Sequence, residues 1–134
     1  MDGPLRILVC EDDDRLATLV EETLGGDGRF AVVGRATDGD EAVLLAQEHG
    51  PDVVLMDIGL PGRDGIEATR AIHEHDRSQH VVIYTGSGEY EDVARADAAG
   101  AVGFLHKDAL TSPDLPEAIL VLHRNYRGGV PDPD

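Results

Sequence analysis

The stretch that decides the fold runs from Pro51 to Gly65 and reads Pro-Asp-Val-Val-Leu-Met-Asp-Ile-Gly-Leu-Pro-Gly-Arg-Asp-Gly. Its apolar run, 53–56, is too short for a helix and is typical of a strand buried on both faces, the kind found in parallel sheets. Asp57 follows this run directly and opens a segment rich in glycine. We therefore expect Asp57 at the carboxyl end of a strand, where open α/β sheets bind ligands. On this stretch alone, a turn-forming or helix-capping role explains the aspartate equally well.

The composition favours a single domain that binds cations rather than anions. The chain has 134 residues, of which 41% are hydrophobic, and this suffices for a core without disulfides or metals. Acids outnumber bases by 27 to 11, so the net charge of −16 opposes binding to nucleic acid or to an anionic membrane.

Cysteine usage and the absence of targeting signals favour a cytoplasmic location. The single cysteine, Cys10, lies in an apolar run and has no intrachain partner, which fits a buried strand residue in a reducing compartment. No segment approaches the roughly 18 apolar residues of a membrane span. The N-terminus does not resemble a signal peptide.

Hydrophobic periodicity predicts alternating strands and helices. Strands are predicted at 5–10, 30–36, 53–56, 81–84 and 102–105, and a short helix at 90–99. The other helices are expected to turn apolar stripes inward: Leu16, Leu19, Val20, Thr23 and Leu24; Ala42, Leu45, Ala46 and His49; Ile66, Thr69, Ile72 and His73; Leu115, Ala118, Ile119, Leu122 and Tyr126. Asp13 or Asp14 should cap the first helix and Asp38 the second. Five strands alternating with five helices through short links predict a doubly wound α/β fold with a five-stranded parallel sheet.

Charged and polar residues gather where the predicted strands end. Glu11 and Asp12 follow the first strand, Asp57 the third, Thr85 the fourth and Lys107 the fifth. If the third strand lies beside the first, three carboxylates crowd together at one edge of the sheet, which is costly unless a cation occupies the cluster. Mg²⁺ is the natural occupant, because one or two carboxylates, a carbonyl and water satisfy it.

Lys107 is the single lysine in a chain with ten arginines. An ammonium group is a compact, rotatable charge that can pair with a carboxylate and then with a phosphoryl oxygen. Its place at the end of a strand favours a role in the site over the chance retention of one surface lysine.

Five segments in order resemble the receiver domain of bacterial response regulators. They are 7–12 (Ile-Leu-Val-Cys-Glu-Asp), 51–57 (Pro-Asp-Val-Val-Leu-Met-Asp), 60–65 (Leu-Pro-Gly-Arg-Asp-Gly), Thr85 and 103–108 (Gly-Phe-Leu-His-Lys-Asp). No single segment is decisive, but five in this order are highly specific and span nearly the whole chain. The details at 65–68 and 107–109 are most similar to receivers attached to LuxR-type helix-turn-helix output domains.

The resemblance implies a flavodoxin-like fold with strand order 2-1-3-4-5 and a receiver domain over residues 5–127. Residues 128–134 are Gly, Pro and Asp apart from one valine, which is typical of a flexible tail or the start of a linker.

The resemblance also implies a phosphoacceptor site. Asp57 would accept a phosphoryl group from the phosphohistidine of a sensor histidine kinase. Asp12 and Asp57 would bind Mg²⁺ directly and Glu11 through water, while the backbone carbonyl of Gly59 would complete the protein ligands.

For the remaining site residues, the resemblance implies a switch. Thr85 and Lys107 would hold phosphoryl oxygens, and Phe104 matches the aromatic position whose rotation reports the state of Thr85. The face made by the fourth helix, the fifth strand and the fifth helix would change and control an output domain or partner, as in transcription regulation. The chain would catalyse only its own phosphorylation and dephosphorylation, and DNA would be bound only by an output domain outside this chain.

The chain departs from the family pattern in three places. Asp108 stands where many receivers have a proline, Gly59 has no side chain where most have one, and Phe104 lacks a tyrosine hydroxyl. Gly59 and Ser87 are expected to overhang the phosphoryl group, and neither is an acid or amide long enough to orient a water molecule. We expect access rather than positioning to set the rate at which the phosphoryl group is lost.

The last helix is expected to carry an association surface. Leu120 and Val121 should point away from its inward stripe and form an exposed apolar pair. Because LuxR-type receivers often pair through their first and last helices, this pair predicts a homodimer surface.

Three other interpretations compete with an active receiver. An FMN-binding flavodoxin would need a hydroxyl-rich phosphate loop where this chain has the acids 11–14, which repel phosphate. A phosphatase of the haloacid dehalogenase type would need a second acid at the position of Gly59. A degenerate or stand-alone receiver that serves as a protein-interaction module is the serious alternative, and the complete acid pocket with Lys107 argues against it.

Overall fold

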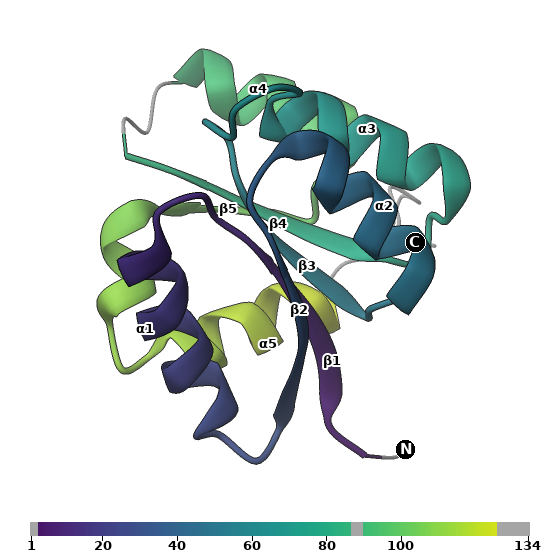
Figure 1. Cartoon of the computed structure of the whole chain (residues 1–134). Helices are drawn as coiled ribbons and strands as arrows, with labels where there is room; N and C mark the ends of the chain where they lie inside the picture. The colour runs from purple at the N-terminus through teal and green to yellow at the C-terminus, as the bar shows by residue number, and fades with distance from the viewer. Residues whose placement is uncertain (1–2, 87–89, 126–134) are drawn as a thin grey trace, which may run out of the picture.

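A parallel sheet with the strand order β2-β1-β3-β4-β5 forms the middle layer of the protein (Figure 1). The computed structural model describes residues 3–86 and 90–125, and within these ranges the sheet has five strands. The strands are β1 (Leu5–Cys10), β2 (Phe30–Ala36), β3 (Val53–Asp57), β4 (His80–Thr85) and β5 (Gly103–His106). The strand order and the parallel pairing confirm the predicted fold class.

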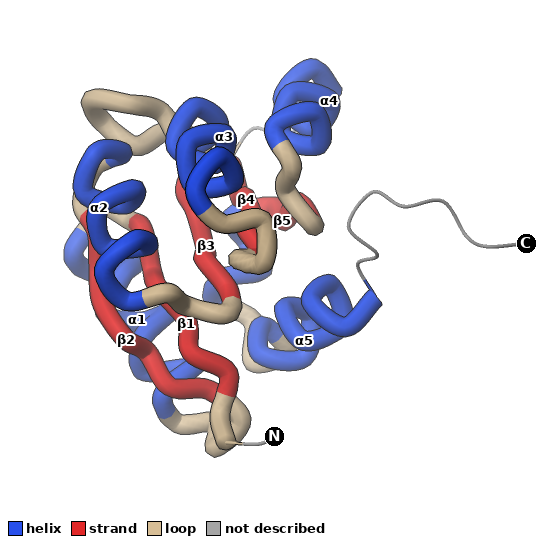
Figure 2. Tube along the Cα trace, turned by 90° about the vertical axis from the view of Figure 1, so that its right-hand side faces the viewer, coloured by secondary structure: helices blue, strands red, loops and turns tan. Residues whose placement is uncertain are grey.

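Helices cover both faces of this sheet (Figures 1 and 2). They are α1 (Asp14–Gly25), α2 (Gly39–His49), α3 (Gly65–His75), α4 (Tyr90–Ala99) and α5 (Leu115–Asn125). The core residues divide them into α1 with α5 on one face and α2, α3 and α4 on the other. A short 3₁₀ helix, η1 (Lys107–Thr111), which the sequence did not predict, follows β5. No helix in the described ranges is both long and apolar enough to cross a membrane.

Aspartate side chains begin three of the helices. Asp13 caps α1 by accepting a hydrogen bond from the N–H of Arg15 at 3.0 Å, so Asp13 rather than Asp14 takes this role. Asp38 caps α2 in the same way, as predicted, and Asp64 caps α3. These side chains satisfy backbone N–H groups that the first helical turn leaves without a partner.

The strand that contains Asp57 lies at the centre of the sheet and is buried on both faces, as predicted. Val54 and Met56 pack into the core beneath α2, α3 and α4, whereas Val53 and Leu55 pack into the core beneath α1 and α5. This alternation is the period of a β-strand. Asp57 is the last residue of the strand and therefore lies at the carboxyl edge of the sheet.

The prediction for Leu120 was wrong: this side chain is 4% exposed and belongs to the core between the sheet and α5. The loop before β2 lies against α5, where Arg29 forms a 2.9 Å ion pair with Glu117. Leu120 also lines a hollow together with Leu5 and Arg29, so little of this side chain is free to form an association surface. Val121 is 43% exposed, as expected.

Two other residues placed on inward stripes are exposed. Leu19 is 51% exposed, because α1 turns Ala17 inward in its place, together with Val20 and Leu24 as predicted. His49, in the last turn of α2, is exposed as well. Tyr126, the domain boundary at residue 127 and the tail at 128–134 lie outside the described residues.

Candidate functional site

Three carboxylates meet at the carboxyl edge of the sheet. Glu11 and Asp12 directly follow β1, and Asp57 ends β3. Since β1 and β3 are neighbours with Cys10 opposite Met56, the three acids stand level with one another. One oxygen from each carboxylate lies within 4.8 Å of the others. The structure thus brings together the acids that the sequence placed at this edge.

Glu11 is the buried member of the cluster, with 1% exposure. Its Oε1 accepts a hydrogen bond from the hydroxyl of Tyr84, and its Oε2 accepts one from the backbone N–H of Asp13 at 2.9 Å. Burial raises the pKa of the Glu11 carboxyl, and these two donors act in the opposite direction. Both oxygens of Glu11 therefore already have a protein donor.

Asp57 is half-buried, and its Oδ1 accepts a hydrogen bond from the backbone N–H of Gly59 at 3.0 Å. Burial raises the pKa of the Asp57 carboxyl; the Gly59 bond and Lys107 lower it, and Asp12 raises it further. Clustered carboxylates in a partly desolvated site favour a bound cation. The cluster offers only carboxylate oxygens, the donors that suit Mg²⁺, so these residues fit the ion that the sequence predicted.

Thr85 ends the neighbouring strand and is 5% exposed. Asp57 is paired with Tyr84 across β3 and β4, so Thr85 stands one residue further toward the same edge. The prediction that Thr85 lies at the carboxyl edge beside the acids therefore agrees with the strand register.

Lys107 completes this edge from the far side of β4. It directly follows His106, which is paired with Thr85 across β4 and β5. Its positive charge lowers the pKa of both Glu11 and Asp57. An ammonium group therefore shares the electrostatic environment of the acid cluster, at the position the sequence singled out.

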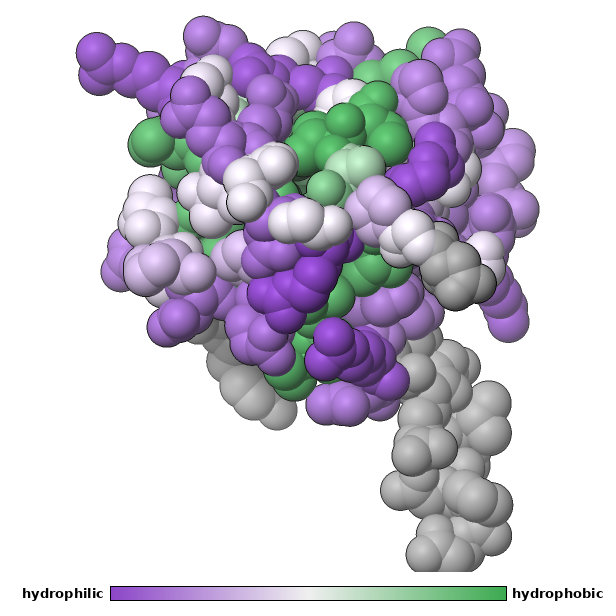
Figure 3. All heavy atoms as spheres, turned by 90° about the horizontal axis from the view of Figure 1, so that it is seen from below, coloured by the Kyte–Doolittle hydropathy of each residue, from purple (hydrophilic) through white to green (hydrophobic). Residues whose placement is uncertain are grey.

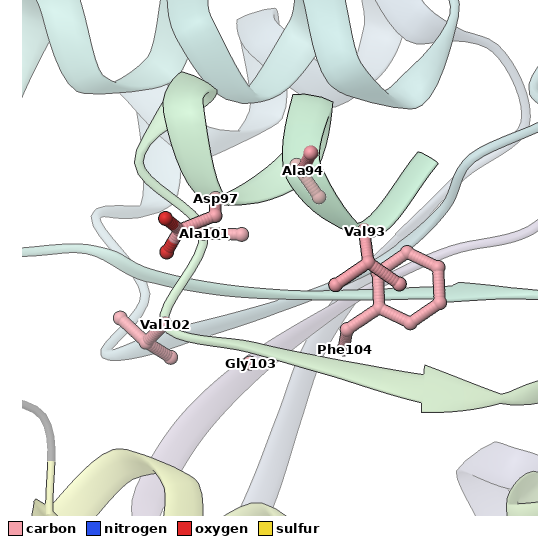
Figure 4. A pocket seen from close by; sticks show the side chains of 8 residues that line it. Val93, Ala94, Asp97, Ala101, Val102, Gly103 and Phe104 are labelled. Carbon is pink, nitrogen blue, oxygen red and sulfur yellow. The ribbon is translucent and has the colours of Figure 1, made fainter. Parts of the chain in front are cut away.

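Phe104 lies further down β5, at the border of a hollow between α4 and β5 with a volume of about 420 Å³ (Figure 4). Val93 of α4 lines the same hollow, which opens beside the half-buried aromatic ring. Phe104 also packs against the core beneath α2, α3 and α4. The ring of Phe104 therefore lies between this hollow and the core.

The two residues predicted to control access differ in what the structure shows. A Cβ placed on Gly59 would lie 3.7 Å from Oδ1 of Asp57, an ordinary van der Waals distance, so a side chain at this position would adjoin the carboxylate. Ser87 lies outside the described residues.

Tyr84 is the site residue that sequence reasoning missed. It belongs to the core beneath α1 and α5, yet its hydroxyl reaches the carboxylate of Glu11, 73 positions earlier in the chain. A single hydroxyl at the end of the apolar run 81–84 was the available signal. A buried tyrosine usually needs a hydrogen-bond partner, and a strand ending beside acids supplies one.

A doubly wound α/β sheet with an acid cluster, a threonine and a lysine at its carboxyl edge defines a class of aspartate phosphoacceptor domains. Residues 7–120 match the family described as the response regulator receiver domain, and the chain belongs to this family. Receivers are phosphoacceptor switches of phosphorylation-dependent signalling and bind Mg²⁺ at an acidic pocket; Glu11, Asp12 and Asp57 form such a pocket here.

Known proteins resemble the chain in sequence and in fold. It is 37% identical to the chemotaxis protein CheY of Halobacterium salinarum over 114 residues, which cover 85% of this chain and 92% of CheY. It is 34% identical to the nitrate/nitrite response regulator protein NarL of Escherichia coli over 116 residues, 87% of this chain but 53% of NarL. The signal receiver domain of the response regulator NarL from Mycobacterium tuberculosis has the same fold, with a TM-score of 0.87, 30% identity, and coverage of 93% of this chain and 100% of that domain. The chain therefore spans nearly all of one relative and about half of another.

Proposed function

We propose that Asp57 accepts a phosphoryl group from the phosphohistidine of a sensor histidine kinase in a reaction that requires Mg²⁺. The observation that carries this proposal is the cluster of three carboxylates within 4.8 Å at the carboxyl edge of the sheet. Lys107, which acts electrostatically on two of these acids, supports it. A receiver that serves only as an interaction module would have no use for this arrangement.

Within this proposal, Asp12 and Asp57 hold Mg²⁺ directly, and the backbone carbonyl of Gly59 is a further ligand. Glu11 acts through water, and the two donors that already engage its oxygens favour this indirect role. When bound, Mg²⁺ supplies neutralisation of the charge that builds up between the carboxylates and the phosphoryl oxygens.

The side chains of this chain then position the transfer. A carboxylate oxygen of Asp57, oriented by the N–H of Gly59, attacks phosphorus. The P–N bond of the phosphohistidine breaks, and its electron pair leaves with the imidazole. The ammonium of Lys107 and the hydroxyl of Thr85 bind the phosphoryl oxygens, because this chemistry depends mainly on alignment and charge neutralisation.

The switch follows from the new charge and acceptor oxygens on Asp57. Thr85 moves toward the phosphoryl group, the ring of Phe104 turns into the hollow beside α4, and the α4–β5–α5 face changes. The volume of that hollow supports this movement. Similarity to the transcriptional regulatory protein PdtaR of Mycobacterium tuberculosis, which is 38% identical and of which the match covers 58%, supports control of transcription through an output domain.

The test is phosphorylation by a small phosphodonor such as acetyl phosphate, followed by intact-protein mass spectrometry. We expect one phosphoryl group on the wild type with Mg²⁺ and none with excess chelator or in Asp57→Asn. Asp40→Asn, which changes an exposed acid of α2, is the matched control and should behave as the wild type. Modification that persists in Asp57→Asn or without divalent ions would refute the proposal.

We also propose that the open face beside Asp57 sets the lifetime of the phosphoryl group. Gly59 has no positive φ, and its Cβ position is free of close contacts, so side chains fit there without strain. Gly59→Asn should speed hydrolysis by orienting water, a gain of up to roughly 10²-fold, whereas Gly59→Met should slow it by shielding. If both variants slow hydrolysis equally, steric access alone is at work, and if neither changes it, Gly59 does not border the phosphoryl group.

A further inference from the structure

Two histidines lie in contact near the start of β4, away from the carboxyl edge that carries the acids. His80 begins β4, and His123 lies in the last turn of α5. Their Nδ1 atoms are 2.9 Å apart, and their ring centroids are 4.7 Å apart with the planes inclined at 60°. Neither residue has a part in phosphoryl transfer, so the contact calls for its own explanation.

The fold aims both side chains at the same point. Val82 and Tyr84 pack beneath α1 and α5, and the two-residue period of a strand places His80 on that same face of β4. On α5, His123 continues the line of the buried Leu115 and Ile119 at intervals of four residues. Each histidine therefore ends an apolar stripe, and the two half-buried rings meet where these stripes converge.

A third histidine nearby is already engaged. The Nε2 atom of His73 lies 3.1 Å from the backbone oxygen of Gln79. Because a carbonyl oxygen can only accept a hydrogen bond, this nitrogen donates its proton. Between His80 and His123, two Nδ1 atoms face each other. Only one proton fits between them, with one nitrogen donating and the other accepting.

A metal ion can take the place of that proton. For metal–nitrogen bonds of about 2.0–2.1 Å, two ligands at a right angle lie roughly 2.9 Å apart and two tetrahedral ligands roughly 3.3 Å apart. The observed 2.9 Å is an ordinary hydrogen-bond distance, and it is also close to the spacing of two ligands at a right angle in a square-planar or octahedral ion. Cu²⁺ and Ni²⁺ prefer such geometry with nitrogen ligands, and Zn²⁺ needs only a slight opening of the pair.

We propose that His80 and His123 form a binding site for a divalent transition-metal ion of the Cu²⁺ or Ni²⁺ type, separate from the acidic Mg²⁺ pocket. Water fills the remaining coordination positions. The site lies in the last turn of α5, where the helix dipole favours cations, and in a chain with a net charge of −16. A bound ion tethers the end of α5 to the start of β4. The ligand chemistry separates the two sites, since imidazole suits transition metals and carboxylate suits Mg²⁺.

The test is calorimetric titration of the full chain with Ni²⁺ at pH 8, because metal binding needs a deprotonated ring nitrogen and competes with protons, with excess Mg²⁺ to occupy the acidic pocket. We expect one bound Ni²⁺ per chain. His80→Gln and His123→Gln should each weaken binding by more than about tenfold, since even the loss of an outer-sphere partner costs that much. His75→Gln, which removes an exposed histidine of α3, is the matched control and should leave the affinity unchanged.

A second readout separates binding from folding. Ni²⁺ should raise the melting temperature of the wild type and of Asp57→Asn but not that of His123→Gln, and Cu²⁺ bound to the wild type should show the electron paramagnetic resonance couplings of two nitrogen ligands. The proposal is overturned if His123→Gln, folded by circular dichroism, binds Ni²⁺ as tightly as the wild type. It is equally overturned if binding disappears in Asp57→Asn, because the ion then occupies the acidic pocket.

Discussion

The two faces of the sheet are packed with side chains of different size. Among the described residues, the core beneath α1 and α5 contains mostly large apolar side chains: Ile7, Val9, Val20, Leu24, Phe30, Val53, Leu55, Val82, Tyr84, Leu110, Leu115, Ile119 and Leu120. The one small side chain that α1 adds is the fully buried Ala17. In the core beneath α2, α3 and α4, seven of sixteen buried residues are alanines. Each buried methylene stabilises a fold by about 0.8 kcal/mol. On average, a buried residue of the core beneath α1 and α5 therefore contributes more to the stability of the fold than one beneath α2, α3 and α4.

The difference is sharpest between α4 and α5, the two helices of the proposed switch face. Helix α4 contributes Ala96 and Ala99 to the core, whereas α5 contributes Leu115, Ile119 and Leu120. Elements with little buried apolar surface open locally at low cost. A switch needs one part that moves and one that stays in place, and we propose from this packing that α4 moves and α5 stays in place. Viewed from below, the surface is mostly hydrophilic, with apolar side chains in separate patches (Figure 3).

The largest expected effect is on the core beneath α1 and α5. Ile119→Ala removes a fully buried side chain of α5 and should lower the free energy of unfolding by about 2–5 kcal/mol, through lost burial and a residual cavity. Urea denaturation followed by circular dichroism measures this change. A loss below about 1 kcal/mol would mean that α5 repacks easily, and the contrast between the two faces would fail.

The next effect concerns the link between this face and the acid pocket. Tyr84→Phe leaves the packing intact but removes the donor to buried Glu11, which should cost about 1–3 kcal/mol. The matched control is a double-mutant cycle with Glu11→Gln, since removal of the Tyr84 hydroxyl should cost less once the carboxylate is gone. Because the amide oxygen of glutamine can still accept, equal costs in both backgrounds would show that the charge of Glu11 adds nothing to this hydrogen bond.

A smaller effect is expected on the alanine-rich face. Ala96→Gly in α4 should lower the free energy of unfolding by roughly 1–2 kcal/mol, through one lost buried methyl group and the helix penalty of glycine. In hydrogen exchange, the amides of α4 should exchange faster than those of α5 in the wild type. Slower exchange in α4 than in α5 would reverse the proposed assignment of roles.

The single thiol offers a probe of the same face. Cys10 is fully buried in the core beneath α2, α3 and α4, and burial raises the pKa of its thiol. Alkylation needs both access and a thiolate, so iodoacetamide should react with Cys10 only when this core opens. We expect Ala96→Gly to accelerate the reaction under native conditions, whereas Ala118→Gly, the matched change on α5, should accelerate it less.

Much of the fold and of the acid pocket was predictable from sequence because both depend on local patterns. The run 53–56 is apolar without interruption, and Asp57 follows it, so strand and strand end are marked within five residues. The acids Glu11 and Asp12 end another such run. Parallel strands bring their carboxyl ends to one edge whatever the details of packing, so the pocket did not depend on contacts that a sequence hides.

The features that were missed depend on contacts between distant parts of the chain. Leu120 belongs to the same core as Ile7 and Val53, which stand much earlier in the chain, whereas Val121 is exposed. The hydrogen bond from Tyr84 to Glu11 likewise joins two strands that are not neighbours in the sequence. Helical periodicity identifies an apolar stripe but not its rotation by one residue, which tertiary packing selects.

The smallest expected effect tests the corrected surface of α5, where we propose that two copies of the chain associate through α1 and α5. Leu120 belongs to the core, so a charge at that position would unfold the protein and would say nothing of association. Val121 is exposed, and Val121→Glu should change the free energy of unfolding by less than about 0.5 kcal/mol.

If phosphorylated protein sediments as a dimer, Val121→Glu should shift it toward monomer, because a charge in an apolar contact is costly to desolvate. Leu44→Glu, which charges an exposed leucine of α2, is the control and should leave the dimer intact. A dimer that survives Val121→Glu would place the contact elsewhere. A large loss in the free energy of unfolding would show that Val121, like Leu120, packs against the core beneath α1 and α5.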